Sequence, residues 1–339
     1  MSAKVFKQLP TFTARTYRGG LLLRQFLKME NAVDDHYPED WISSFVEAKN
    51  KNFVKNEGIT RVSVDQKDRL INEVVESSDF GEGRKNSGVL IKLLDAAERL
   101  GIQAHPTKEY SKKYFNTPYG KTECWYIIST RDENACVYLG FKEHVTREYF
   151  KTLFETQNIP EMLNAMHRFE VSAGDVILVS AGTPHAIGAG CFLLEIQEPT
   201  DYTMRVEKQT STNEALTPQQ IHYGVGEEAM LDCFSYVGSD KETVRKRHFL
   251  PKRQAGHKVF DLVRYTDTDC FALKKIEGGE YQSKENHFVT VVVLEDGGTL
   301  CYDDCTISLE QGEKYFIGAN TEFTLRDAVA ILCYPPKIQ

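Results

Sequence analysis

Four polar side chains in three separate segments have types suited to binding one metal ion: Gln103, His105, Glu123 and His185. Gln103 and His105 are two residues apart. Because side chains alternate between the two faces of a β-strand, both would point to the same side of a sheet. Nitrogen and oxygen donors of this kind suit a divalent ion such as zinc. We therefore expect the three segments to meet at one metal site.

These four ligands also have plainer interpretations. Gln103 and His105 could be buried side chains with ordinary hydrogen bonds, and a lone glutamate is more often a salt-bridge partner. Glu123, however, precedes Trp125 in an apolar stretch, where a carboxylate needs a cation or a metal to offset its desolvation. A shared metal is the stronger interpretation because it explains all three segments. Gln103 ranks last among the ligands, since a glutamine oxygen binds weakly.

The segment that ends in His185 predicts a β-strand followed by a tight turn. Gly182 stands at the turn, where a positive φ angle suits glycine. The same build recurs at 312–323, where Asn320 stands in the place of Gly182 and Phe323 in the place of His185. We predict a second β-unit that lacks the metal ligand. Chance similarity between two glycine-bounded strands is the alternative.

Most of the chain predicts short strands, with a few helices between them. Apolar residues at intervals of three and four predict helical segments near 62–82 and 146–168, the second with Thr146 as its N-cap. Residues 89–95 are almost continuously apolar, which is typical of a buried strand. The charged stretch 236–258 predicts a connecting segment, and only strands follow it. The sequence therefore indicates a mainly β protein.

Composition excludes several classes of protein. The chain has 339 residues, 41% of them hydrophobic, with a formal net charge of −8, which disfavours nucleic acid or an anionic membrane as a partner. No apolar run approaches the roughly 20 residues that span a bilayer, and the first residues do not resemble a signal peptide. The eight cysteines stand mostly alone in apolar runs, as buried thiols do in a reducing compartment. We expect a soluble, cytoplasmic protein.

Four motifs, in order along the chain, resemble those of the type I mannose-6-phosphate isomerases, which belong to the cupin superfamily. They are Ile102-Gln-Ala-His-Pro106, Gly120-Lys-Thr-Glu-Cys-Trp-Tyr126, Ala181-Gly-Thr-Pro-His-Ala-Ile-Gly188 and Leu194-Glu-Ile-Gln-Glu-Pro-Thr-Asp-Tyr-Thr-Met-Arg205. The similarity begins near Tyr17, includes Pro38-Glu-Asp-Trp41 and extends through the tail. The short interval between Glu123 and His185 resembles the short bacterial form of the family.

The resemblance implies a cupin jelly-roll β-sandwich with a few helices as the catalytic domain, residues 1–235. A second, cupin-like β-domain without metal ligands would follow at 236–339. It also implies one zinc ion per chain and zinc-dependent interconversion of mannose 6-phosphate and fructose 6-phosphate, with a small sugar phosphate as the binding partner. The oligomeric state is left open.

The family's site residues transfer onto this chain motif by motif. Its zinc ligands correspond to Gln103, His105, Glu123 and His185, and its other site residues to Arg205, Lys92 and Lys121. For the two lysines, three roles stay open: contact with the phosphate or sugar, proton transfer at a lowered pKa, and structural pairing with carboxylates.

Some positions depart from the family pattern. Ala104 and Ser180 stand where relatives usually have valine and proline. Met204 stands where many have tyrosine, and it could alter the sugar pocket. The competing interpretations are a related metal-dependent cupin isomerase for another sugar or sugar phosphate, an iron oxygenase that uses the two histidines and the glutamate, and a non-catalytic sugar-binding cupin.

Overall fold

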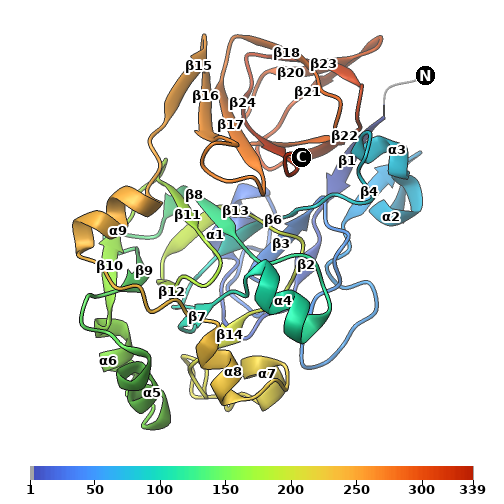
Figure 1. Ribbon diagram of the computed structural model, residues 1–339. Coiled ribbons are helices and arrows are strands. Elements are labelled where there is room, and N and C mark those ends of the chain that lie inside the picture. The colour runs from blue at the N-terminus through green and yellow to red at the C-terminus, as the bar shows by residue number, and fades with distance from the viewer. Residues whose placement is uncertain (1–3, 339) are drawn as a thin grey trace.

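The computed structural model describes residues 4–338, which form four β-sheets with nine helices between and beside the strands. In Figure 1 the C-terminal strands, orange to red, gather at the top, and the green and yellow helices lie at the opposite end. The mainly β architecture with few helices is confirmed.

Two of the sheets come largely from the first two thirds of the chain. In spatial order, the five-stranded sheet contains β10 (Met166–Glu170), β9 (Cys136–Phe141), β12 (His185–Ile187), β7 (Gln103–Ala104) and β14 (Met204–Arg205). The six-stranded sheet contains β11 (Val176–Val179), β8 (Glu123–Thr130), β13 (Cys191–Gln197), β6 (Leu90–Asp95), β3 (Glu39–Ile42) and β2 (Phe12–Thr13). The predicted buried strand is β6, whose six residues are all buried.

The other two sheets hold the C-terminal strands. The nine-stranded sheet runs β15 (Arg253–Gly256), β16 (Val259–Val263), β17 (Ala272–Glu277), β24 (Val329–Tyr334), β19 (Val289–Val293), β22 (Lys314–Ile317), β1 (Val5–Leu9), β4 (Arg61–Val64) and β5 (Lys67–Leu70). The four-stranded sheet contains β18 (Glu280–Lys284), β23 (Glu322–Arg326), β20 (Thr299–Tyr302) and β21 (Cys305–Ser308). Strand β1, from the start of the chain, pairs with β22, so this sheet contains strands from both sides of residue 235. The domain boundary expected at 235/236 stays a prediction.

Apolar clusters between the sheets stack them as layers in the order five, six, nine and four strands. Trp125 and Leu139 belong to the cluster between the first two layers. Leu93 and Phe316 belong to the cluster between the six- and nine-stranded sheets, and Phe323 to the cluster between the last two. Each interior is filled by β-branched and aromatic side chains, which suit a pleated surface. The predicted metal ligands come from the first two layers.

The helices are short and lie mostly on one side. They are α1 (Leu21–Phe26), α2 (Ile71–Val74), α3 (Ser77–Phe80), α4 (Lys108–Phe115), α5 (Arg147–Glu155), α6 (Ile159–Asn164), α7 (Pro218–His222), α8 (Glu227–Asp232) and α9 (Lys241–His248). Within residues 4–338, no helix has the length and apolar character needed to cross a lipid bilayer.

The two predicted helical segments differ in outcome. Helices α5 and α6 fill most of 146–168, and the Thr146 hydroxyl accepts a hydrogen bond from the Tyr149 amide as the N-cap. The prediction for 62–82 is wrong in its first half, which is a hairpin of β4 and β5. Asp65 and Gln66 both have positive φ, as a two-residue hairpin turn requires. Pairing of β4 with β1 buries Val62 and outweighs the local helical pattern.

The connection expected at 236–258 is more ordered than predicted, since it contains helix α9 and strand β15. The strands expected after it are all present as β16 to β24. Helix α9 begins at Asp240, whose carboxylate accepts the Thr243 amide. Its charged residues are mostly exposed, but Val244 and His248 are buried, and Val244 belongs to the cluster between the five- and six-stranded sheets. Two buried residues among eight are too weak a pattern to recognise in a sequence.

The two similar segments adopt the same local structure. Strands β11 and β22 both begin two residues after a glycine with positive φ. Gly182 has a φ of 83° and Asn320 a φ of 61°. The next residue of each turn donates to a carbonyl three residues earlier, Thr183 at 3.1 Å and Thr321 at 3.2 Å. The equivalent strands then pair alike, with His185 opposite Gln103 and Phe323 opposite Ser283.

The positive φ at Asn320 predicts how substitution there affects stability. Asn320→Val forces a β-branched residue into the left-handed region, and we expect it to lower the free energy of unfolding by about 1–2 kcal/mol. Asn320→Gly tolerates this backbone and should change stability far less. Urea unfolding of the two variants measures the difference. Equal loss in both would contradict a conformational requirement at this turn.

Candidate active site

Strand pairing brings the three ligand-bearing segments together. His185 opens β12 and lies opposite Gln103 of β7. Glu123 opens β8 and lies opposite Val179 of β11 and Gln197 of β13. The five- and six-stranded sheets face each other here, so residues from both reach one buried point. The sequence reasoning required this convergence but could not show it.

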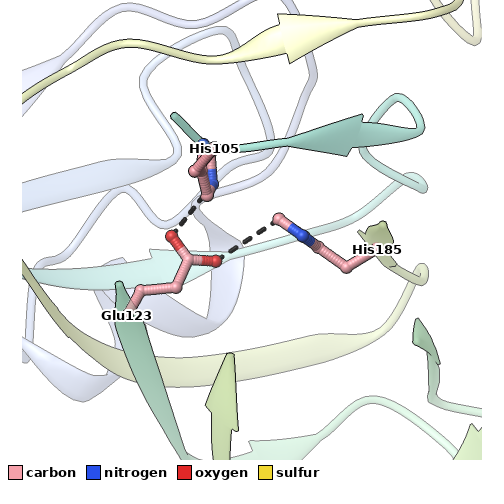
Figure 2. A group of neighbouring side chains, drawn as sticks. All are labelled: His105, Glu123 and His185. Carbon is pink, nitrogen blue, oxygen red and sulfur yellow. Dashed lines mark ion pairs between the residues drawn. The ribbon is translucent and has the colours of Figure 1, made fainter. Parts of the chain in front are cut away.

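His105, Glu123 and His185 form a compact cluster, with ligand atoms all within 4.8 Å of one another. Figure 2 shows the Glu123 carboxylate between the two imidazoles, one oxygen toward each. His105 Nε2 lies 3.0 Å from Glu123 Oε2, and His185 Nε2 lies 3.4 Å from Glu123 Oε1. All three residues are at most 1% exposed.

Backbone carbonyls fix the orientation of both imidazoles. His105 Nδ1 donates to the Tyr202 carbonyl at 3.1 Å, and His185 Nδ1 donates to the Thr183 carbonyl at 2.9 Å. A neutral histidine that uses Nδ1 as the donor keeps a lone pair on Nε2. Gln103 is adjacent, and its amide nitrogen is 3.2 Å from His185 Nε2. In this arrangement Gln103 donates, whereas a ligand would have to offer its oxygen.

The electrostatics of the cluster fit a divalent cation. Burial lowers the pKa of His105 to about 3 and also lowers the pKa of His185, so both imidazoles are neutral. Burial opposes ionisation of Glu123, but His105 and Lys121 hold its pKa well below the usual range. Neither Glu123 oxygen receives a hydrogen bond from the residues that the structure describes. Two neutral imidazoles and a bare carboxylate are the donor set of a zinc site.

Lys121 supplies the positive charge nearest to these atoms. Its Nζ lies 3.0 Å from His105 Nε2 and 3.4 Å from Glu123 Oε2. Burial lowers the pKa of Lys121, which is the condition for one of the three roles that the sequence left open, proton transfer. It is therefore the stronger of the two lysine candidates for proton transfer.

Lys92 lies in a different environment. Its Nζ is 3.0 Å from Glu195 Oε1 and 3.8 Å from Glu39 Oε2. Burial opposes its charge, but the two carboxylates outweigh burial and raise the pKa of Lys92. Of the three roles that the sequence left open for Lys92, this pairing does not favour proton transfer at a lowered pKa, because both strands beside β6 carry a glutamate.

Arg205 lines a cavity that Lys92 and Lys121 also line, and it lacks a carboxylate partner. Its NH1 nitrogen donates to the carbonyls of Gln220 at 2.7 Å and Thr203 at 3.4 Å. Among residues 4–338, no carboxylate forms an ion pair with its guanidinium. The cavity is also lined by Arg15, Tyr17, Glu39, Lys92, Arg99, Gln103, Lys121, Glu195, Asp201 and Glu207. Arg205 is therefore the cation here most available to an anionic ligand.

Six charged residues of this cavity were not predicted from the sequence: Arg15, Glu39, Arg99, Glu195, Asp201 and Glu207. Arg15 donates to Glu39 at 2.8 Å and to Asp201 at 3.3 Å. The Trp125 indole donates to Glu195 at 3.2 Å. The sequence offers a signal for Glu195, which stands in an apolar strand as Glu123 does. Glu39 stands beside Asp40 in a short strand and has no such signal.

Met204 does not line this cavity. It is fully buried in the apolar cluster that joins the five-stranded sheet to the helices. The alternation along the strand places Thr203 and Arg205 on the cavity side and Met204 on the other. The departure from the family pattern at this position therefore lies outside the pocket.

Comparison with known proteins gives one family. Residues 15–135 match the family model described as phosphomannose isomerase type I, catalytic domain. Mannose-6-phosphate isomerase ManA of Bacillus subtilis is 28% identical over 233 residues, which are 68% of each protein. The resemblance inferred from the four motifs is confirmed.

Solved structures extend the similarity to nearly the whole fold. The mannose 6-phosphate isomerase from Bacillus subtilis matches with a TM-score of 0.75 at 21% identity, over 98% of this chain and 99% of that one. A mannose 6-phosphate isomerase described as holo and zinc bound matches with a TM-score of 0.75 at 16% identity, over 98% and 100%. At these identities the matches establish the fold.

Glu39 predicts a pH dependence of stability. Burial opposes its ionisation, but Arg15 and Lys92 lower the pKa of Glu39 to about 2 from 4.5. A depressed pKa stabilises the fold above pH 4.5, and this contribution is lost as the pH falls toward 2. The shift corresponds to about 3 kcal/mol. We expect Glu39→Gln to unfold at lower urea than the parent at pH 7, with a gap that narrows steadily below pH 4.5.

Glu242→Gln is the matched control, since that glutamate is exposed on α9 and pairs only with Lys246. Its urea midpoint should stay close to the parent at every pH. A gap for Glu39→Gln that does not change with pH would mean that the ionised Glu39 contributes nothing to stability.

Proposed function

Because this chain is a relative of the type I mannose-6-phosphate isomerases, which are aldose–ketose isomerases, we propose that it interconverts mannose 6-phosphate and fructose 6-phosphate. The observation that carries the proposal is the cluster of His105, Glu123 and His185, which contacts Lys121, beside a cavity that Lys121 and Arg205 both line. The cluster offers a metal site, and the arginine offers a cation to an anionic substrate. A non-catalytic sugar-binding protein would need neither in this combination.

The proposed cofactor is one zinc ion per chain, held by His105, Glu123 and His185, with Gln103 as the weakest ligand. When bound, it would stabilise negative charge that develops on a substrate oxygen. Tyr202 and Thr183 hold the two imidazoles so that each Nε2 faces the carboxylate. Such outer hydrogen bonds fix the tautomer that a metal ligand needs.

The isomerisation moves one proton between C1 and C2 and another between the two oxygens. Lys121 is buried beside the cluster with a lowered pKa, so we propose that it holds or moves one of these protons. Lys92 stays charged because Glu195 and Glu39 surround it, so its proposed role is to bind and orient the sugar. Arg205 would bind the phosphate or the anionic oxygen through its planar group.

The cellular location expected from the sequence remains part of the proposal. All eight cysteines are free thiols, which fits a reducing compartment such as the cytoplasm.

Metal removal tests the cofactor and the reaction together. Dialysis against a chelator should abolish conversion of mannose 6-phosphate to fructose 6-phosphate, and added zinc should restore it. If added zinc restored conversion of another sugar phosphate but not of mannose 6-phosphate, the result would support the alternative of a related isomerase. Full turnover in protein shown by elemental analysis to be metal-free would end the zinc proposal.

Arg205→Ala should lower kcat by about 10²–10³-fold, as removal of one preorganised donor does in other enzymes. Zinc content and the unfolding midpoint should stay near those of the parent, because Arg205 forms no ion pair among residues 4–338 and bonds mainly to two carbonyls. Arg205→Lys is the conservative control, which keeps the charge and should recover part of the rate. Loss of zinc or of folding in Arg205→Ala would make the residue structural.

A further inference from the structure

A buried ion pair connects the C-terminal strands to the cavity. Lys314 of β22 pairs with Asp40 of β3 through its Nζ and Oδ2. Lys314 is 1% exposed and Asp40 is fully buried. Each lies among apolar side chains of the cluster between the six- and nine-stranded sheets. Taking two charges out of water is costly, so a structural or functional reason for the pair is expected.

Asp40 stands between Glu39, which lines the cavity, and Trp41, whose ring lies under two cations that line it. Side chains alternate along β3, so Asp40 faces the nine-stranded sheet while Glu39 and Trp41 face the other way. The carboxylate of Glu39 accepts the Trp41 indole at 2.7 Å and the Tyr17 hydroxyl at 2.7 Å. Asp40 also accepts the Thr11 amide at 2.7 Å. The position of β3 therefore decides where Glu39 lies.

Glu39 in turn holds two cations of the cavity. Arg15 Nε donates to it at 2.8 Å, and Lys92 Nζ lies 3.8 Å away. Arg15 and Lys92 also lie over the Trp41 ring, at 4.8 Å and 5.2 Å from its centre. A small displacement of β3 would move both cations relative to the candidate metal ligands.

We propose that Lys314 is a positioning residue for the site: by pairing with Asp40 it fixes β3, so that Glu39 and Trp41 hold Lys92 and Arg15 in place. The expected effect of Lys314 on turnover rests on the proposed isomerase function. Its expected effect on the position of β3 does not depend on that function. The C-terminal strands would then contribute to catalysis without contacting substrate.

The test compares Lys314→Met with Thr290→Val. Thr290 lies in the same interface, where its hydroxyl is 2.6 Å from the Ser43 hydroxyl, just beyond the end of β3. Both variants remove a buried polar contact, but only the first acts on Asp40. We expect Lys314→Met to lower kcat by about ten-fold or more, since small misplacements of catalytic groups are costly. Thr290→Val should keep the parent kcat, with a smaller loss of stability, because it removes a hydroxyl contact and leaves no buried charge unpaired.

A double variant separates positioning from stability. Asp40→Leu with Lys314→Met removes both charges, and replacing a buried pair by apolar residues is often neutral or stabilising. We expect the double variant to be as stable as the parent and still slow. This variant also keeps the test valid if Lys314→Met alone fails to fold. Parent turnover in the stable double variant would overturn the proposal.

Tryptophan resonances give a readout that does not depend on activity. The chain has two tryptophans, and their indole groups donate to Glu39 and Glu195. In a proton–nitrogen correlation spectrum, Lys314→Met and the double variant should shift the Trp41 indole signal more than that of Trp125, because β3 reaches the Trp125 acceptor Glu195 only through Lys92. Thr290→Val should shift neither. An unmoved Trp41 signal would refute the positioning role, whereas a shifted signal in a protein without isomerase activity would refute only the proposed function.

Discussion

The buried carboxylate of Glu123 is the constraint on which the site depends. A charge at 1% exposure without a hydrogen-bond donor is unfavourable unless a cation compensates it. The two imidazoles beside it are neutral, since burial lowers the pKa of both. Lys121 compensates part of the charge from 3.4 Å. A divalent cation would interact with the carboxylate and with both Nε2 lone pairs at once, which explains why these three groups are buried side by side.

The same scaffold without these ligands occurs in the C-terminal strands. The pairing that sets His185 opposite Gln103 sets Phe323 opposite Ser283. Glu123 of β8 lies opposite Val179 of β11, and in the equivalent strand pair Val289 of β19 lies opposite Ile317 of β22. There the interior is an apolar cluster that contains Val289 and Phe323. The paired sheets are therefore stable without a charged site, and the chemistry belongs to a few side chains placed on them.

The sequence could predict the parts of the site that local spacing determines. A mainly β fold, the two segments with the same turn, and the apolar surroundings of Glu123 all follow from alternation and turn residues. The hairpin of β4 and β5 did not follow, because its stability comes from pairing with β1, which is its spatial neighbour but lies far away in the sequence.

Long-range partners set the limit for the charged residues too. The pKa of Lys92 depends on Glu195, about a hundred residues later in the chain, so its own strand could not decide among the three roles that the sequence left open. Arg15, Glu39 and Asp201 come from separate segments, and none has a distinctive spacing. Only the tertiary structure shows that they surround the same cavity.

The pairing of charges in the cavity bears on the choice of substrate. Arg15 pairs with Glu39 and Asp201, Lys92 with Glu195, and Lys121 with Glu123. Arg205 is left with carbonyl partners alone. These four cations and four carboxylates balance, so the proposed divalent metal would bring an excess of two positive charges into a buried space. A phosphate monoester carries about that much negative charge at neutral pH. The cavity would therefore favour a phosphorylated sugar over a neutral one for the same reason that it favours the metal.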